Sequence, residues 1–266
     1  MTQTITKIES QKRRGRFNVY VDGAYAFPVS EEVLIKYRLF KGMEVDELLI
    51  NQLKKADDVS KLHSRALDFL AHHLRTDHEV REKLAEITED SNAIDSVIAQ
   101  LRRQRLIDDR KYADSYVRTV VREAKNGPDW IRRHLKDKRV KADLIEASLV
   151  QYYPEATAIE IGAEVAQKQL SHHKHDSAKM AINKTKNLLM RRGFNFSLID
   201  EIMNEVDTSE LVVHDQEIIN QLAEKYWRKY AKYDSYEQKQ KTKQALYRKG
   251  FLIDDIEAVL AQLSES

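Results

Sequence analysis

The chain has 266 residues, a formal net charge of +2, 33% charged residues and no cysteine. The absence of cysteine excludes disulfides, cysteine nucleophiles and cysteine-ligated zinc. No apolar run approaches the roughly 20 residues that cross a bilayer, and the N-terminal segment lacks the apolar centre of a signal peptide. With only 3 prolines and 7 glycines, the composition predicts a mostly helical protein of the cytoplasm that does not contact membranes.

The first thirty residues predict β structure. Thr4–Glu9 and Arg16–Val21 have strand character, and Asp22-Gly23 is a strong two-residue hairpin signal before a third strand at Ala24–Pro28. The loop between the first two strands is basic, with Lys12, Arg13, Arg14 and Arg16. It is either the solvated loop of a small β-hairpin cap or a loop that contacts phosphate.

Helical patterns fill the rest of the chain. Ser30 can start a short helix at Glu31–Tyr37, and Asp46 can cap a helix that ends near Ala56. From Lys61 onward every segment predicts helix. The expected helices and caps are His63–Leu74, a helix capped by Thr76, a helix capped by Asn92, residues 155–170, 177–192, 215–232 and 235–249, with residues 207–213 as a connection.

One join between two helices occurs twice near the end of the sequence, as LMRRGFNFSLIDEIM (189–203) and LYRKGFLIDDIEAVL (246–260). A helix ends in basic residues, and a glycine and a phenylalanine follow. Glycine tolerates the left-handed backbone that closes a helix. The expected caps of the next helices are Ser197 and Asp254, with Asp200 and Glu257 at capping-box spacing.

Two weaker copies of this join are found by alignment. In one, Leu101, Arg105 and Leu106 align with the leucine, glycine and phenylalanine, and Asp109 with the cap. In the other, Leu135, Arg139 and Val140 precede Asp143 and Glu146. The four joins lie near residues 106, 140, 194 and 251, at spacings of 34, 54 and 57 residues. We therefore expect stacked three-helix repeats of about 45–55 residues.

The expected organisation is an N-terminal β-hairpin with short helices, then four three-helix repeats. The boundaries are 1–60, 61–107, 108–153, 154–207 and 208–266. A helix–turn–helix join is either a DNA reader or only a way of packing helices, and the pattern alone does not decide.

Basic blocks recur along the chain, with net charges of +8 at 98–141, +6 at 168–192 and +7 at 225–250. Recurring cations could follow a phosphate backbone. Tyr226, Trp227, Tyr230, Tyr233 and Tyr236 alternate with lysines, which suits either single-stranded bases or a helix core. The candidate contacts for DNA or a protein partner are Arg13, Arg14, Arg16, Arg102, Arg103, Arg105, Arg132, Arg133, Lys136, Lys138, Arg139, Arg191, Arg192, Lys225, Arg228, Lys229, Arg248 and Lys249.

At LIDDRKYADSYV (106–117) the sequence resembles the signature of the RecX family of recombination regulators. The residues that carry the resemblance are Asp108, Asp109, Tyr112, Ala113 and Tyr116, with ALDFLAHHLRTDHEVREKL (66–84) and the N-terminal extension in support. His72-His73 and Arg105 depart from the usual pattern. We expect the signature residues to be mainly structural.

The resemblance implies tandem three-helix repeats in an elongated, curved array. It also implies a negative regulator of homologous recombination and DNA repair in the SOS response, which binds the RecA filament on single-stranded DNA. Filament growth, ATP hydrolysis and strand exchange would be restrained. Direct binding to DNA, single-stranded or also double-stranded, is implied as well. We expect a monomer.

Enzymatic hypotheses have little support in the sequence. There is no GxxxxGK[ST] phosphate loop. His172, His173 and His175 lie in a polar turn without an acid at clear ligand spacing, so we expect no metal site, no cofactor and no catalysis. The rival hypothesis is a helix-turn-helix transcription regulator, although such proteins usually carry one clear DNA-reading element and a dimer element.

Overall fold

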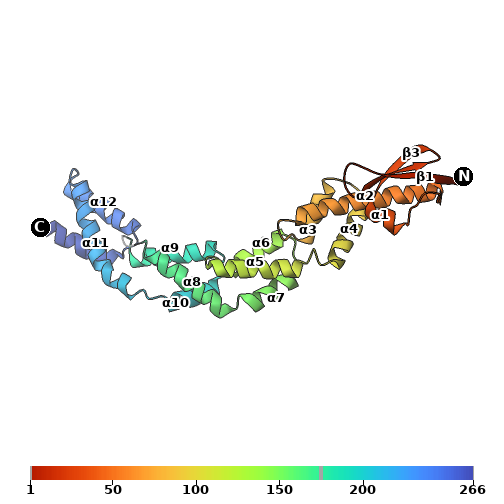
Figure 1. Cartoon of the computed structure of the whole chain (residues 1–266). Helices are drawn as coiled ribbons and strands as arrows, with labels where there is room; N and C mark the ends of the chain where they lie inside the picture. Colours follow the sequence, from red (N-terminus) through yellow and green to blue (C-terminus); the bar gives the residue numbers. More distant parts are fainter. Residues whose placement is uncertain (1, 174–175, 266) are drawn as a thin grey trace. The chain divides into compact units, whose positions relative to one another are not determined.

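The computed structural model describes residues 2–173 and 176–265. Its described part contains thirteen helices and one small antiparallel sheet (Figure 1). Contacts divide the chain into two compact units. The first contains the chain up to Ala113 together with Asp137–Leu144, and the second contains Asp114–Lys136 together with the chain from Ile145.

The sheet has the strand order β3-β2-β1-β4. Strands β1 (Gln3–Ser10), β2 (Arg16–Val21) and β3 (Ala24–Ser30) confirm the three predicted strands and the hairpin between the last two. β4 (Glu44–Val45) is too short to leave a pattern in the sequence. The buried face of the sheet packs with α1 and α2 around a core that includes Ile5, Val19, Phe27 and Val33.

The helices from the first unit onward are α1 (Glu31–Lys36), α2 (Glu47–Leu70), α3 (Asp77–Ala85), α4 (Ser91–Arg103), α5 (Asp109–Glu123), α6 (Pro128–Asp137) and α7 (Ala142–Tyr152). They are followed by α8 (Glu155–Leu170), α9 (Ala178–Arg191), α10 (Phe196–Glu205), α11 (Ser209–Tyr230), α12 (Ser235–Arg248) and α13 (Ile253–Glu265). The expected connection at 207–213 was wrong, because α11 already begins at Ser209.

Helix α2 corrects a prediction of two helices, one ending near Ala56 and one at His63–Leu74. It is continuous because no glycine or proline interrupts residues 47–70. Its first half places Leu53 in the core beneath the sheet, and its second half places Leu62 and Ala66 in the core of α2, α3 and α4. One helix thus serves two cores, and the boundary expected at residue 60 falls inside it.

Ser30, Asp46 and Thr76 cap α1, α2 and α3 as predicted, and Thr76 forms a full capping box with Glu79. The other predicted caps were displaced. Asp90 caps α4 in place of Asn92, and Asn195 caps α10 in place of Ser197. The remaining three predicted caps, Asp109, Asp143 and Asp254, lie inside the first turns of α5, α7 and α13. Several side chains near each helix start are able to cap, and the backbone geometry selects among them.

Four ion pairs between residues 14 positions apart define the repeat. They are Arg81–Asp95, Arg132–Glu146, Lys186–Asp200 and Lys243–Glu257, with N···O distances of 2.5 to 3.0 Å. The pairs divide the helices into four three-helix sets, which are α2 with α3 and α4, α5 with α6 and α7, α8 with α9 and α10, and α11 with α12 and α13. Each ion pair joins the second helix of its set to the third. The acids expected to complete capping boxes therefore hold two helices together instead.

These pairs also correct the register of the first join. The basic residues of the four ion pairs lie 51, 54 and 57 residues apart. In the first set, the join that is equivalent to the other three therefore lies between α3 and α4. The stretch around Arg105 is the link between two sets. Three residues after each first member, Leu84, Leu135, Leu189 and Leu246 are fully buried. The expected left-handed turns are confirmed, since φ is positive at Arg105, Arg139, Gly193 and Gly250.

Candidate interaction surfaces on the three-helix repeats

The join of a later set docks on the start of the second helix of the preceding set. In the second unit, the Gly127 N–H donates to the Arg192 carbonyl at 2.8 Å, and the Asp129 N–H donates to the Gly193 carbonyl at 3.0 Å. Ser177 Oγ donates to the Lys249 carbonyl at 2.9 Å. In the first unit, Lys138 Nζ lies 2.6 Å from Glu79. The joins thus act as junctions between sets.

At two junctions the turn residue must be glycine for a second reason besides its positive φ, because the preceding set packs too closely for a Cβ. A Cβ on Gly193 would lie 2.3 Å from the Trp130 nitrogen, and one on Gly250 would lie 2.6 Å from Ser177 Oγ. The same turn is formed by Arg139, with φ of +57°, and its Cβ is accommodated. The turn chemistry was predictable from sequence, whereas the close contact was not.

A half-buried carboxylate completes two of the junctions. Asp109 accepts a hydrogen bond from the Asp77 N–H at 2.9 Å, and Asp215 accepts one from the Ala178 N–H at 2.7 Å. Both amides belong to first residues of helices, where no intrahelical acceptor exists. The equivalent first residue of α6 is Pro128, which has no N–H. Burial raises the pKa of both Asp109 and Asp215.

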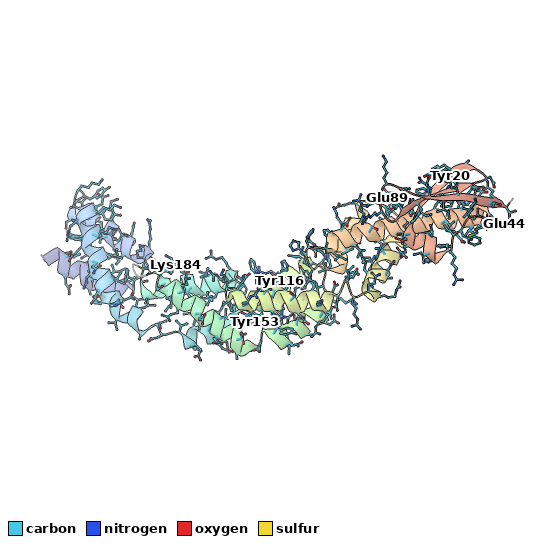
Figure 2. The ribbon with its side chains drawn as sticks, in the orientation of Figure 1. Tyr20, Glu44, Glu89, Tyr116, Tyr153 and Lys184 are labelled. Carbon is cyan, nitrogen blue, oxygen red and sulfur yellow. The ribbon has the colours of Figure 1, made fainter. Side chains whose placement is uncertain are left out.

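The signature residues make intramolecular contacts. Asp108, not Asp109, accepts a hydrogen bond from the Lys111 N–H at the start of α5, at 3.1 Å. Ala113 is fully buried. Tyr116, labelled in Figure 2, stacks on His134 at 4.0 Å between ring centroids, and burial raises the pKa of Tyr116. Tyr112 is half-buried. These contacts lie within the chain.

Another buried phenol lies in the second unit. Tyr153 is 3% exposed, and burial raises its pKa. Its side chain is labelled in Figure 2. Its hydroxyl donates to the Asn126 carbonyl at 2.9 Å. It therefore ties the end of α7 to the loop before α6.

Six of the eighteen candidate cations form ion pairs in the chain, and a seventh, Arg192, donates to the backbone carbonyl of a distant segment. Arg16 forms a bidentate pair with Asp57 at 2.6 and 2.9 Å, and Arg132 forms one with Glu146 at 2.8 Å. The others are Arg102 with Asp77, Lys138 with Glu79, Arg228 with Glu224, Lys249 with Asp176 and Arg192 with the Lys125 carbonyl. These contacts give them structural roles that the sequence did not reveal.

The other eleven candidates are exposed and form no ion pair with any residue that the structure describes. They are Arg13, Arg14, Arg103, Arg105, Arg133, Lys136, Arg139, Arg191, Lys225, Lys229 and Arg248. Two of them contact rings, because Arg133 lies over Trp130 at 5.8 Å and Lys229 over Tyr230 at 5.5 Å. These cations are available to an external anion.

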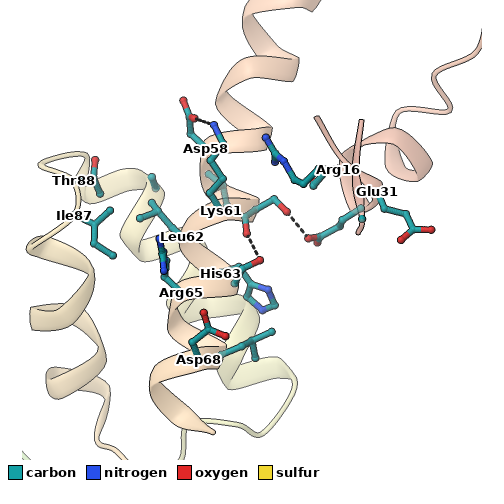
Figure 3. Close-up of a pocket in the computed structure, with 18 of the residues that line it drawn as sticks. Arg16, Glu31, Asp58, Lys61, Leu62, His63, Arg65, Asp68, Ile87 and Thr88 are labelled. Carbon is teal, nitrogen blue, oxygen red and sulfur yellow. Dashed lines mark hydrogen bonds and ion pairs between the residues drawn. The ribbon is translucent and has the colours of Figure 1, made fainter. Parts of the chain in front are cut away.

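A cleft of about 1110 Å³ lies in the first unit between the β1–β2 loop, α2 and the α3–α4 loop (Figure 3). Arg13 and Arg14 line it. Lys61 also lines it but is held by Asp57 at 3.1 Å and Asp58 at 2.9 Å. Acids of the lining, among them Glu31 and Asp68, mix with the cations. The cleft therefore does not present one sign of charge.

The aromatic group near the end of α11 divides into two parts. Tyr226 and Trp227 are partly buried against the core of α11, α12 and α13. The ring centroid of Tyr230 lies 6.3 Å from that of Tyr226 and 6.3 Å from that of Tyr233. Tyr236 is 74% exposed. Lysines surround the outer rings, with Lys241 Nζ 4.4 Å and Lys232 Nζ 5.3 Å from Tyr233. The inner rings are core, and the outer rings form an aromatic and cationic surface.

The predicted polar turn makes local contacts where it is described. His172 Nδ1 lies 2.5 Å from the Lys168 carbonyl, and His173 Nδ1 lies 3.1 Å from Asp176. His175 lies outside the described residues. Across residues 2–173 and 176–265, no group of three or more possible metal ligands is found. Within the same ranges, no helix combines the length and apolar character that a membrane span needs.

Family models match most of the chain. The regulatory protein RecX N-terminal domain matches residues 3–46, and the first, second and third three-helix domains of RecX match 63–101, 108–149 and 214–260. Residues 150–213 lie outside these four matches. The matched three-helix domains confirm the expected fold class of three-helix repeats behind a small β extension.

Relatives match over nearly their full length. The Regulatory protein RecX of Levilactobacillus brevis is 43% identical over 98% of this chain and 98% of its own. That of Limosilactobacillus reuteri is 40% identical over 96% and 97%. A crystal structure of regulatory protein RecX aligns at 38% identity over 76% of this chain and 100% of that chain, with a TM-score of 0.69. RecX from Lactobacillus salivarius aligns at 36% identity over 57% and 98%, with a TM-score of 0.55.

Proposed function

The chain belongs to the RecX family of regulatory proteins, and we propose that it binds the RecA recombinase filament and DNA and restrains filament growth, ATP hydrolysis and strand exchange. It would thereby act as a negative regulator of recombination and DNA repair in the cytoplasm, as a monomer. The observation that carries this proposal is the division of the cations. One group is held by contacts within the chain, and the other is exposed without an ion pair in the described chain, with Arg139, Arg191 and Arg248 beside joins.

The exposed cations give a surface for phosphate. Arg103, Arg105 and Arg139 belong to the first compact unit, and Arg191 and Arg248 occupy equivalent positions in two sets of the second. Cations that recur in stacked repeats suit the regular spacing of phosphates on a nucleic-acid strand. Binding through them displaces counterions, so its affinity falls with salt.

A preference for single strands is supported by the outer rings of α11, α12 and the turn between them. Tyr230 and Tyr233 are half-buried and Tyr236 is exposed, and lysines stand beside them. Exposed aromatic faces accept unpaired bases, and adjacent cations neutralise the backbone. Double-stranded DNA would use the cations alone.

The third three-helix repeat, α8 to α10, is part of the proposal. Helices α8, α9 and α10 pack on one another and carry the 14-residue ion pair and the glycine turn, although they lie outside the matched family models. We infer that residues 154–207 are a repeat that stacks like the others. Restraint of RecA then needs no chemistry by this chain, because a bound row of repeats can block movements of the subunits it touches.

The helix-turn-helix transcription regulator has less support. Two of the four third helices, which would enter a DNA groove, begin with Phe196, 72% exposed, and Ile253, 48% exposed. Most base pairs are distinguished in the groove by hydrogen-bonding side chains, which these two residues lack. Equal affinity for random sequences would agree with the proposal, whereas strong preference for one duplex sequence would favour the regulator.

The direct test is the rate of ATP hydrolysis by purified RecA on single-stranded DNA. We expect the full chain to lower that rate. Replacing Arg191 and Arg248 by glutamine should weaken DNA binding while leaving the thermal midpoint unchanged. An unchanged hydrolysis rate at saturating protein would reject the proposal.

A further inference from the structure

Large apolar side chains are exposed at two equivalent joins. At the α9–α10 join, Met190 is 41% exposed and Phe196 is 72% exposed. At the α12–α13 join, Tyr247 is 62% exposed and Ile253 is 48% exposed. We call Met190 with Phe196 and Tyr247 with Ile253 the two apolar pairs. Grouped exposed apolar side chains of this size mark interaction sites more often than isolated ones do.

The equivalence of the apolar pairs follows from the ion pairs beside them. Lys186 and Asp200 link α9 to α10 at 3.0 Å. Met190 lies four residues after the lysine, and Phe196 lies four residues before the acid. Residues four apart share one face of a helix, so both apolar side chains lie on the face of the ion pair, one turn nearer the join.

The fourth set repeats this arrangement. Lys243 and Glu257 link α12 to α13 at 2.5 Å, and Tyr247 and Ile253 stand in the same relation to them. In each set one apolar residue lies in the last turn of the second helix, and the other is the first residue of the third helix.

The fold does not require apolar residues at these places. The first set has Ala85 and Ser91 there, and the second set has Lys136 and Ala142. All four sets nevertheless form the same ion pair and bury the same leucine. The apolar pairs are therefore specific to the third and fourth sets and serve something other than the join.

An exposed cation directly follows one member of each apolar pair in the sequence. Arg191 follows Met190, and Arg248 follows Tyr247. Both arginines are exposed and form no ion pair within the described chain. A matching partner surface would be an apolar socket with carboxylates at its rim. Methionine, phenylalanine, tyrosine and arginine are the residue types enriched in protein–protein interfaces.

We propose that the two apolar pairs are equivalent docking points for two identical subunits of a protein filament, each offering an apolar socket rimmed by carboxylates. This partner is chosen because the apolar pair occurs twice, on successive repeats. Two copies of one surface suit a partner that also presents the same surface repeatedly. This inference rests on the proposed function, in which that partner is the RecA filament. The two contacts form one linked interaction, so together they bind far more tightly than either alone.

The test measures affinity of the full chain for RecA filaments assembled on fluorescent oligo-dT, by anisotropy. One variant is Met190→Ser with Phe196→Ser, a second is Tyr247→Ser with Ile253→Ser, and a third combines all four changes. Val150→Ser is the matched control, since Val150 is 79% exposed on α7 outside both pairs. Thermal melting checks that each variant is folded.

We expect each double variant to lose about 10- to 100-fold in filament affinity, and the fourfold variant to lose more than either. The control should bind like the original chain, and affinity for bare oligo-dT should be unchanged throughout. Full filament affinity in the folded fourfold variant would overturn the inference and leave the proposed function standing. No filament binding by the original chain would overturn both.

Two further outcomes would reassign the apolar pairs. An equal loss of affinity for bare oligo-dT would make them a nucleic-acid contact and overturn the inference. A dimeric original chain with a monomeric fourfold variant, measured by sedimentation, would make them a contact between two copies of this chain and also overturn it.

Discussion

The junction made by Arg139 and the junctions made by Gly193 and Gly250 use the same left-handed turn but differ in how closely the preceding set approaches. Behind Gly193 lies the backbone nitrogen of Trp130, and behind Gly250 lies the hydroxyl of Ser177. At Arg139 a Cβ fits, and contact with the preceding set is made by the neighbouring Lys138, through its ion pair with Glu79. The residue at the turn therefore indicates the kind of contact. Where it is glycine, the preceding set packs directly against the backbone of the join. Where it is arginine, the two sets contact each other through side chains.

The largest expected effect is on the glycine junction. Gly193→Ala places a Cβ 2.3 Å from a backbone atom and puts alanine at φ of +85°, so we expect a loss of about 3 kcal/mol or more in the free energy of unfolding. Urea unfolding measures it. Arg139→Gly is the matched change in the opposite direction and should be neutral or stabilising by up to about 1 kcal/mol. Similar losses in both variants would remove the distinction between the junctions.

The next effect concerns the ion pairs between sets. Asp176 is mostly buried and pairs with Lys184 and Lys249, so Asp176→Ala should lower the free energy of unfolding by about 1–3 kcal/mol. Burial tends to raise the pKa of Asp176, but hydrogen bonds from the two lysines outweigh it and leave the pKa lowered. A lowered folded pKa means that this stability is present above the unfolded pKa of about 4 and is lost as pH falls through the folded value.

The matching experiment compares the original chain with the Asp176→Ala variant at pH 7 and at pH 3. The difference in free energy of unfolding should be large at pH 7 and should shrink at pH 3. A difference that stays the same at both pH values would show that charge pairing is not what the carboxylate contributes.

A smaller effect on the free energy of unfolding is expected for Asp109, whose carboxylate accepts a hydrogen bond from the first N–H of α3. Asp109→Ala leaves the Asp77 N–H without its acceptor and should cost about 1 kcal/mol. Asp109→Asn keeps an acceptor oxygen and removes the half-buried charge. Because burial raises the folded pKa of Asp109, its contribution is present below the unfolded pKa and is lost as pH rises through the folded value. The asparagine variant should therefore gain stability relative to the original chain between pH 4 and pH 7, and a pH-independent difference would contradict this.

The smallest expected effect on stability is from the exposed cations. Replacing Arg103, Arg105 and Arg139 by glutamine should leave the thermal midpoint unchanged, since none forms an ion pair in the described chain. The salt dependence of DNA binding should become shallower by about one unit of slope for each phosphate that the variant no longer binds. Arg132→Gln is the matched control. It should lower stability by removing the ion pair with Glu146 and leave the salt slope unchanged.

Local signals were predictable from the sequence, and contacts between distant segments were not. The hairpin at Asp22-Gly23, the three long strands, the caps Ser30 and Thr76 and the left-handed turns follow from residue preferences over a few positions. The link at Arg105 has the same helix-ending chemistry as a true join, so alignment could not tell it from one. Only the pairing of Arg81 with Asp95 across two helices identifies the first join.

The candidate site was predictable only as a set of cations. Arg132 and Arg133 belong to the same basic block of the sequence and were predicted to act alike. In the structure, Arg132 is bound to Glu146 and Asp129, whereas Arg133 is exposed over Trp130. Neighbours on a helix point in different directions, and the partner of Arg132 lies 14 residues away. A basic block therefore gives the charge of a region without saying which side chains are available. The spacing of 14 is the signal that sequence reasoning could have used.

The measurement that tests the central claim most directly is the growth rate of single RecA filaments on single-stranded DNA, followed by fluorescence before and after the chain is added. We predict that growth slows or stops when the original chain is added, and that the Val150→Ser control has the same effect. Filaments that continue to grow at an unchanged rate, under conditions where the added chain is folded and in excess, would contradict the account.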